Sequence, residues 1–293
     1  MNTDVTLPPH LEEIGRQLTA AAHELRAAPA STRRSRRLLV MFPVVAAVAA
    51  AALVLSSPNT ANLGQHGQAT RVSSPTARQV LDRAAFAALQ TSPLTPRANQ
   101  FVYTKAEGGN GHLSQSWMSV DGVRNSLTWQ SGMSTPTRLP GCADSGCTPQ
   151  PAFFPEMPTT PGAMLPYLEK TQAVHLDDIN DLAKTVGFML DTDYLLPAQQ
   201  SALFQFLAAT PGLTVVQSVQ DVAGRPGIGV EWPYLGSSGM LIFDASSYQY
   251  LGFTTRGING DIRGLALLQT AIVSAAGQQP VQDQQPSAPG GQA

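Results

Sequence analysis

Two cysteines, Cys142 and Cys147, are the residues whose type and spacing most directly suggest chemistry, and they lie in the run LPGCADSGCTP. Two thiols separated by four residues form either a small disulfide loop or half of a metal site. The chain has no second cysteine pair, and its closest histidines on either side, His112 and His175, are distant in sequence. We therefore predict a disulfide, which an oxidising compartment favours, with the metal half-site as the alternative.

The remaining reactive residues do not form a recognisable catalytic pattern. The run GSSG at 236–239 lacks the central serine of a nucleophile elbow. The run DTDY at 191–194 begins like a calcium loop but lacks the required glycine and the final acid, so a helix-ending loop is the simpler interpretation. Asp177, Asp178 and Asp181 suit the first turn of a helix, where acids interact favourably with the helix dipole. We predict no enzymatic activity, no cofactor and no metal.

An uncharged run of 18 residues, LLVMFPVVAAVAAAALVL at 38–55, directly follows a basic cluster. As a helix it extends about 27 Å, close to the thickness of a bilayer core. The basic cluster consists of Arg33, Arg34, Arg36 and Arg37 and predicts that residues 1–37 stay in the cytoplasm while 56–293 lie outside. The alternatives are a cleaved secretory signal and a twin-arginine export signal.

The segments on the two sides of this run differ in character. Inside, a stripe at spacings of four and three predicts a short amphipathic helix: Leu7, Leu11, Ile14, Leu18, Ala21 and Leu25. So short a helix requires a partner, such as a cytoplasmic regulator, or else it is only a partly ordered tail. Outside, residues 56–293 carry 12 Lys and Arg against 16 Asp and Glu, so a nucleic-acid partner is not expected.

The exported part is predicted to begin with a flexible linker at 56–73, which is polar and rich in Gly, Ser and Asn. A helix is expected next, with Ser74 as N-cap and Pro75 in its first position. Alternating runs at 100–106, 112–121 and 124–132 are separated by Gly-rich turns and predict an antiparallel meander.

A Pro-rich stretch at 139–161 interrupts these strands. Helical segments are expected after it, at 162–170, where Pro166 should kink or end the helix, at 179–190 and near 203–207. Four strands follow Pro211, and 264–273 fits either a strand or a helix, of which we predict a strand. The expected α+β domain therefore covers 74–276, with an antiparallel sheet and helices packed on one face, and 277–293 is expected to be a disordered tail.

The order of these segments resembles a known family. The runs QFVYTK, SWMSVDGVRNSL, PGLTVV, DVAGRPGIGV and LIFDASSYQYLGF are similar to an actinobacterial family of uncharacterised single-pass membrane proteins often found beside extracytoplasmic-function sigma factors. The family's exported domain is in turn similar to envelope proteins of the RseB and LolA type. That resemblance implies a half-barrel sheet with helices over its concave face and an apolar groove for acyl chains or an extended peptide.

Six apolar residues of the expected strands and helices are candidates for that groove: Phe101, Trp117, Trp129, Leu165, Tyr167 and Phe204. For each of them, ordinary core packing is the alternative. Two functions fit the whole pattern. The exported domain either senses a lipid, lipoprotein or peptide ligand and reports to a cytoplasmic regulator such as a sigma factor, or it is an envelope carrier or scaffold whose anchor has no signalling role.

Overall fold

The computed structural model of this 293-residue chain describes residues 74–143, 147–172, 174, 179–234, 237–259 and 262–281. The expected cytoplasmic helix, arginine cluster, apolar run and linker, at 1–73, lie outside these residues. Within the described ranges, no helix is both long enough and apolar enough to cross a membrane.

Nine strands form one sheet, and every neighbouring pair is antiparallel. The spatial order is β4-β3-β2-β1-β9-β8-β7-β6-β5, so the last strand joins the N-terminal meander to the C-terminal one. The strands are β1 Phe101–Gly108, β2 Leu113–Ser119, β3 Ser126–Gln130, β4 Thr137–Leu139, β5 Thr214–Gln220, β6 Pro226–Tyr234, β7 Ser237–Asp244, β8 Tyr250–Arg256 and β9 Ile262–Val273. The segment 264–273 is thus a strand, as predicted.

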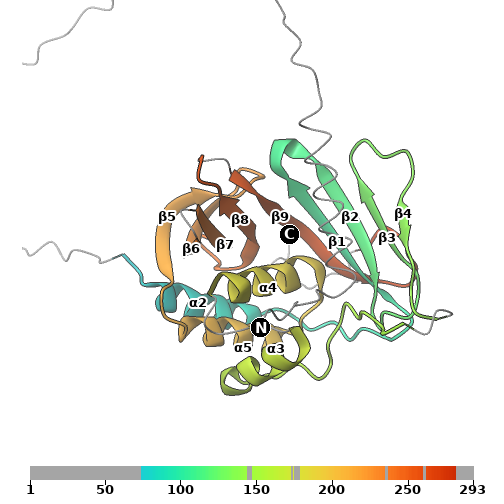
Figure 1. Ribbon diagram of the computed structural model, residues 1–293, viewed down its shortest axis with the longest axis horizontal. Coiled ribbons are helices and arrows are strands. Elements are labelled where there is room, and N and C mark those ends of the chain that lie inside the picture. The colour runs from blue at the N-terminus through green and yellow to red at the C-terminus, as the bar shows by residue number, and fades with distance from the viewer. Residues whose placement is uncertain are drawn as a thin grey trace, which may run out of the picture. The chain divides into compact units, whose positions relative to one another are not determined.

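The helices gather on one side of the curved sheet (Figure 1). They are α2 Ala77–Leu89, α3 Met164–Gln172, α4 Ile179–Thr192 and α5 Pro197–Ala208, with short 3-10 turns η1 Gly109–Gly111 and η2 Pro161–Ala163. Helix α4 packs against β1, β6, β7 and β8, and α2 packs against α5. The main core lies between these helices and β6–β8, so the expected α+β arrangement with helices on one face is confirmed.

Three local expectations were wrong. Thr76, and not Ser74, caps α2, because its hydroxyl accepts from the Gln79 N–H while the Gln79 side chain accepts from the Thr76 N–H. Pro166 neither kinks nor ends α3, since it lies in the first turn, where a missing N–H has no helical partner to lose. Strand β4 forms beside β3, where no strand was expected.

The two faces of the sheet carry different clusters. Along β1, Val102 packs with Ile272 and Tyr194 on the helix side, whereas Phe101 and Tyr103 alternate to the opposite face. Residues 277–281, expected to belong to a disordered tail, are among the described residues and lie against that opposite face, where Trp117 donates to the Gln278 carbonyl. The rest of the expected tail, 282–293, is outside the described residues.

Candidate binding groove

Helix α2 carries two rows of side chains along its length, and one of these rows is buried in the core. Val80, Leu81, Ala84, Ala85 and Ala88 are buried against the rest of the domain. The second stripe, at spacings of four, four and three, follows an adjacent side of the same helix: Arg78, Asp82, Phe86 and Leu89. These spacings place the four side chains in a row along the helix axis.

This second stripe forms one wall of a groove of about 810 Å³. The other walls come from α5, from η2 and from the first turn of α3. The lining residues are Arg78, Asp82, Phe86, Leu89, Pro161, Gly162, Leu165, Gln205, Phe206, Ala208 and Ala209. The small side chains of Ala208 and Ala209 leave room opposite the bulky residues of α2.

Two large apolar side chains of the groove are exposed to solvent, which does not stabilise the isolated domain. Phe86 is 66% exposed and Leu89 is 51% exposed, although both belong to a well-formed helix. Contiguous exposed apolar side chains in a hollow mark sites of interaction. Arg78 and Asp82 form an ion pair of 3.8 Å along the α2 wall, but both side chains are largely exposed, so the pair is weak.

The chemistry of the groove is that of binding. Among the described residues that line it, Arg78 and Asp82 are the ionisable ones. They pair with each other, so these residues offer neither a nucleophile with a base nor a ligand set. Among the residues that the structure describes, no three His, Cys, Asp or Glu side chains gather in a way that would hold a metal ion.

The six candidate groove residues do not lie together. Leu165 lines the groove described above, and Tyr167 is partly buried against the main core. Phe204 is buried, with its ring edge-on to Phe243 at a centroid distance of 5.3 Å. Phe101, Trp117 and Trp129 belong to the cluster on the opposite face of the sheet.

Of the residues that line the groove, sequence reasoning named only Leu165, and the large apolar ones that it missed are Phe86, Leu89 and Phe206. The signal for the first two was present. The stripe Arg78-Asp82-Phe86-Leu89 has the same helical period as the buried stripe, and its last two members are large and apolar.

Away from the groove, an ion pair with a buried aspartate connects the turn between β5 and β6 to β8 and β9. Asp221 has a fully buried side chain, and its carboxylate accepts from the Arg225 Nε at 2.6 Å and from the backbone N–H groups of Ala223 and Arg225. The Arg225 Nη2 also donates to the carbonyls of Leu251 and Leu267 at 2.9 and 3.0 Å. Because β8 and β9 pair only as far as Gly252 and Ala266, this guanidinium joins the two strands at the point where they separate.

A second buried acid lies at the end of α4. Burial raises the pKa of Asp191 to about 7, although the Tyr250 hydroxyl opposes this shift by donating to the carboxylate at 2.9 Å. Helix α4 ends at Thr192, so the run DTDY is a helix end, as expected. The last residue of this run is Tyr194, and its hydroxyl accepts from the Leu94 N–H at 2.6 Å. This hydrogen bond connects the end of α4 to the segment that follows α2.

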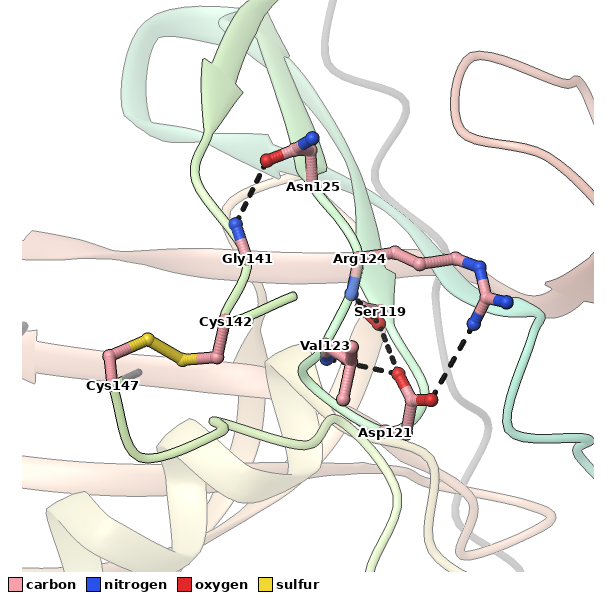
Figure 2. Close-up of a disulfide and its surroundings, with 8 residues drawn as sticks. All are labelled: Ser119, Asp121, Val123, Arg124, Asn125, Gly141, Cys142 and Cys147. Atoms are coloured by element: carbon pink, nitrogen blue, oxygen red, sulfur yellow. Dashed lines mark hydrogen bonds and ion pairs between the residues drawn. A yellow bond between two sulfur atoms is a disulfide. The ribbon is translucent and has the colours of Figure 1, made fainter. Parts of the chain in front are cut away.

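The disulfide between Cys142 and Cys147 is present, as predicted, with a Cα–Cα distance of 5.2 Å (Figure 2). The segment that enters it is attached to the turn between β2 and β3, where the Gly141 N–H donates to the Asn125 Oδ1 at 3.0 Å. Gly122 in that turn has a φ of +70°, and a Cβ there would lie 2.4 Å from the Gln150 backbone. The disulfide therefore belongs to a closely packed turn and loop.

Replacing both cysteines with serine should reduce the free energy of unfolding by roughly 2 kcal/mol, because the cross-link closes a short loop in the unfolded chain. Denaturant unfolding of the oxidised protein and of the double variant measures the difference. The reduced wild-type protein is the control and should match the variant. If all three proteins unfold at the same denaturant concentration, the disulfide has no stabilising role.

No family model matches the sequence, and no curated protein matches it. Among solved structures, the chain aligns with MucB in the MucA/MucB complex of Pseudomonas aeruginosa, at 14% identity and a TM-score of 0.26, over 71% of this chain and 59% of that one. It also aligns with MucB alone, at 14% identity and a TM-score of 0.26, over 73% and 63% of the two chains. The chain thus spans about three fifths of the length of these MucB chains.

At TM-scores of 0.26, these alignments neither confirm nor contradict the expected resemblance to envelope proteins of the RseB type. At this identity and TM-score they provide no correspondence between residues, and no site residue is taken from them. Membership of an actinobacterial family and association with a sigma factor are not tested by them.

Proposed function

We propose that the chain is a membrane-anchored binding protein whose extracytoplasmic domain holds an apolar segment of a partner in the groove between α2, α5 and α3. The observation that supports this most is the exposure of Phe86 and Leu89 inside a hollow. Covering a side chain of this size contributes about 2 kcal/mol of hydrophobic free energy. Two such side chains in a row make the groove an efficient site for an elongated apolar ligand.

The proposed placement follows from the sequence on the N-terminal side. Residues 38–55 would be the anchor and the preceding arginines would remain in the cytoplasm. The disulfide supports an oxidising location for the domain. The stripe from Leu7 to Leu25 would then face a cytoplasmic partner, and ligand occupancy outside would be reported to a regulator of the sigma-factor class.

The alternative is an envelope carrier or scaffold for lipid or lipoprotein. A groove of about 810 Å³ has the volume of a small-molecule site, so it does not exclude an acyl chain. The two functions differ in the class of occupant: a discrete protein partner for sensing, and lipid for carriage.

Substituting Phe86→Glu tests the groove with a defined probe, 1-anilinonaphthalene-8-sulfonate, whose fluorescence rises on apolar surfaces. The variant should bind the probe at least tenfold more weakly than the wild type, because a carboxylate replaces the most exposed apolar side chain of the lining. Its melting temperature should be unchanged, since Phe86 is outside the core.

Phe188→Glu is the matched control, because Phe188 is also a helical phenylalanine, 48% exposed, and it does not line the groove. This variant should retain the wild-type affinity. If wild type and both variants bind the probe equally well, the proposal that the groove is a binding site is wrong. A drop in the melting temperature of Phe86→Glu alone would assign Phe86 to folding.

A further inference from the structure

A cavity separate from the groove lies where the ends of α2 and α4 meet the start of α5 and strand β9. Its volume is about 120 Å³, and none of its described lining residues also lines the groove. Its apolar walls are formed by Leu190, Leu195, Pro197 and Leu267. A larger cavity of about 320 Å³ adjoins it, since both are lined by Thr91, Gln200, Leu267 and Thr270.

Four polar side chains converge on the smaller cavity: Thr91, Asp193, Gln200 and Thr270. Within the described part of the chain, the two threonine hydroxyls and the Gln200 carboxamide have no hydrogen-bond partner. No fully buried side-chain nitrogen or oxygen in the same ranges lacks a partner, so these unpaired groups are ones that open onto accessible space. Convergent polar groups with unused hydrogen-bonding capacity in an otherwise apolar hollow are typical of a small-ligand site.

Asp193 is the acid of this cavity, and its carboxyl group is poorly satisfied by the protein. Its Oδ1 lies 3.2 Å from the Thr192 Oγ1, but that hydroxyl is closer to the Phe188 carbonyl, at 2.9 Å. A hydroxyl has one hydrogen to donate, so the Thr192 hydroxyl that donates to the carbonyl leaves the carboxylate without a donor. Burial raises the pKa of Asp193 well above its usual range. An ionised Asp193 therefore requires a partner from outside the chain.

The surroundings of the cavity favour a cation as that partner. Helix α2 ends at Leu89 and α4 ends at Thr192, and the C-terminal ends of helices carry partial negative charge. The first turn of α5 opposes part of this effect. Arg225 lines only the larger cavity, and its charge is paired with the buried Asp221.

The larger cavity continues the smaller one with a different lining. One of its walls is a row of small side chains on α2, consisting of Ala84, Ala87 and Ala88. Leu267 belongs to both cavities and lies between the polar groups of the one and the alanines of the other. The two cavities together suit a ligand that has a charged head and a thin aliphatic stem.

We propose that the smaller cavity binds the ammonium group of a small aliphatic amine. An ammonium group has three N–H donors and no acceptor, and the Asp193 carboxylate, the threonine hydroxyls and the Gln200 side-chain carbonyl all offer oxygen acceptors to it. The hydrogen bond to the carboxylate joins two charged groups and is the strongest of the set. The aliphatic stem extends past Leu267 along the alanines of α2.

This site and the groove have no described lining residue in common, so failure of the amine site leaves the proposed function untouched. The test is isothermal titration calorimetry of the full chain with two probes, n-butylammonium chloride and 1-butanol. The two probes have the same stem and differ in the charge of the head. Butanol should bind wild type at least about tenfold more weakly, because it cannot form the charge-assisted hydrogen bond to Asp193.

Asp193→Asn should weaken the binding of butylammonium by at least about tenfold and change the affinity for butanol by less than about threefold, because only the charge is removed. The matched control is Asp191→Asn, which removes a buried acid two residues earlier on α4 that does not line the cavity. This control should bind butylammonium within about threefold of wild type. Melting temperatures of all variants report whether they are folded.

Thr270→Val is the second site variant and should weaken butylammonium binding by about threefold or more, because it removes one acceptor at nearly constant shape. If wild type binds neither probe, or binds both equally well, the proposal is wrong. It is also wrong if Asp193→Asn binds butylammonium like wild type, or if Asp191→Asn loses as much affinity as Asp193→Asn. If Asp193→Asn does not fold, an unchanged affinity of Thr270→Val overturns the proposal.

Discussion

Replacing Arg225 with methionine is expected to lower the free energy of unfolding by about 3–5 kcal/mol, which is one of the two largest effects in the molecule. The substitution leaves the Asp221 carboxylate buried without its cation. It also removes the donor that joins the Leu251 and Leu267 carbonyls where β8 and β9 separate. Urea unfolding followed by circular dichroism measures the loss.

Arg78→Met is the matched control, because Arg78 and Asp82 are also an arginine and an aspartate four residues apart, but both are exposed. It should change the free energy of unfolding by less than about 1 kcal/mol. A double variant, Asp221→Asn with Arg225→Met, should recover part of the loss, since the amide carries no charge and its oxygen still accepts from the backbone. Equal effects of Arg225→Met and Arg78→Met would contradict the structural role given to the buried pair.

Asp191→Asn is expected to stabilise the protein at pH 8 by up to about 4 kcal/mol relative to wild type. Burial raises the pKa of Asp191 from 3.8 to about 7, so between these values the native state binds more protons than the unfolded state. The stability contributed by this group therefore falls as the pH rises from about 4 to 7, and the penalty is complete above 7. An amide in the same place has no charge to bury and can still accept from the Tyr250 hydroxyl.

Chemical unfolding of wild type and variant at several pH values tests this. The difference should be near its maximum at pH 8 and should disappear as the pH falls below about 4, where Asp191 is protonated in both states. Burial also raises the pKa of Asp193, but that contribution is common to both proteins and cancels. An Asp191→Asn protein that is less stable than wild type at pH 8 would show that the carboxylate is ionised and favourably bound.

Asp244→Asn provides a control of opposite sign. Hydrogen bonds from Ser246 and Ser247 lower the pKa of Asp244 to about 2, so this group stabilises the native state above about pH 4 and loses that effect as the pH falls through 2. The two variants should therefore show pH profiles that slope in opposite directions.

The strands were predictable because their signals are local. Alternation and Gly-rich turns predicted the meander of β1–β3, and β-branched and aromatic runs predicted β5–β8. The disulfide followed from two cysteines with no other plausible partner. Strand β4 was missed because its three residues form a strand only by pairing with β3.

The site was less predictable because it depends on contacts between distant segments. Trp117 and Leu165 are both large and apolar, but strand alternation and helix rotation place them on opposite faces of the sheet. Burial of Asp221 depends on Arg225 reaching carbonyls of β8 and β9, which no local pattern encodes. Phe86, by contrast, could have been recognised from the sequence as part of a second stripe on α2. It was overlooked because an apolar stripe on a helix is usually assumed to face the core.

The claim that the α2 groove binds a partner is tested most directly by placing a photo-reactive phenylalanine analogue at position 86 in the intact chain in its own cells. Position 188 on α4 is the control, since Phe188 is exposed but outside the groove. We predict a discrete cross-linked protein of one mass from position 86 and none from position 188. Lipid adducts at 86 in place of a protein would favour the carrier alternative, and no adduct at 86, or equal adducts at both positions, would contradict the groove as a binding site.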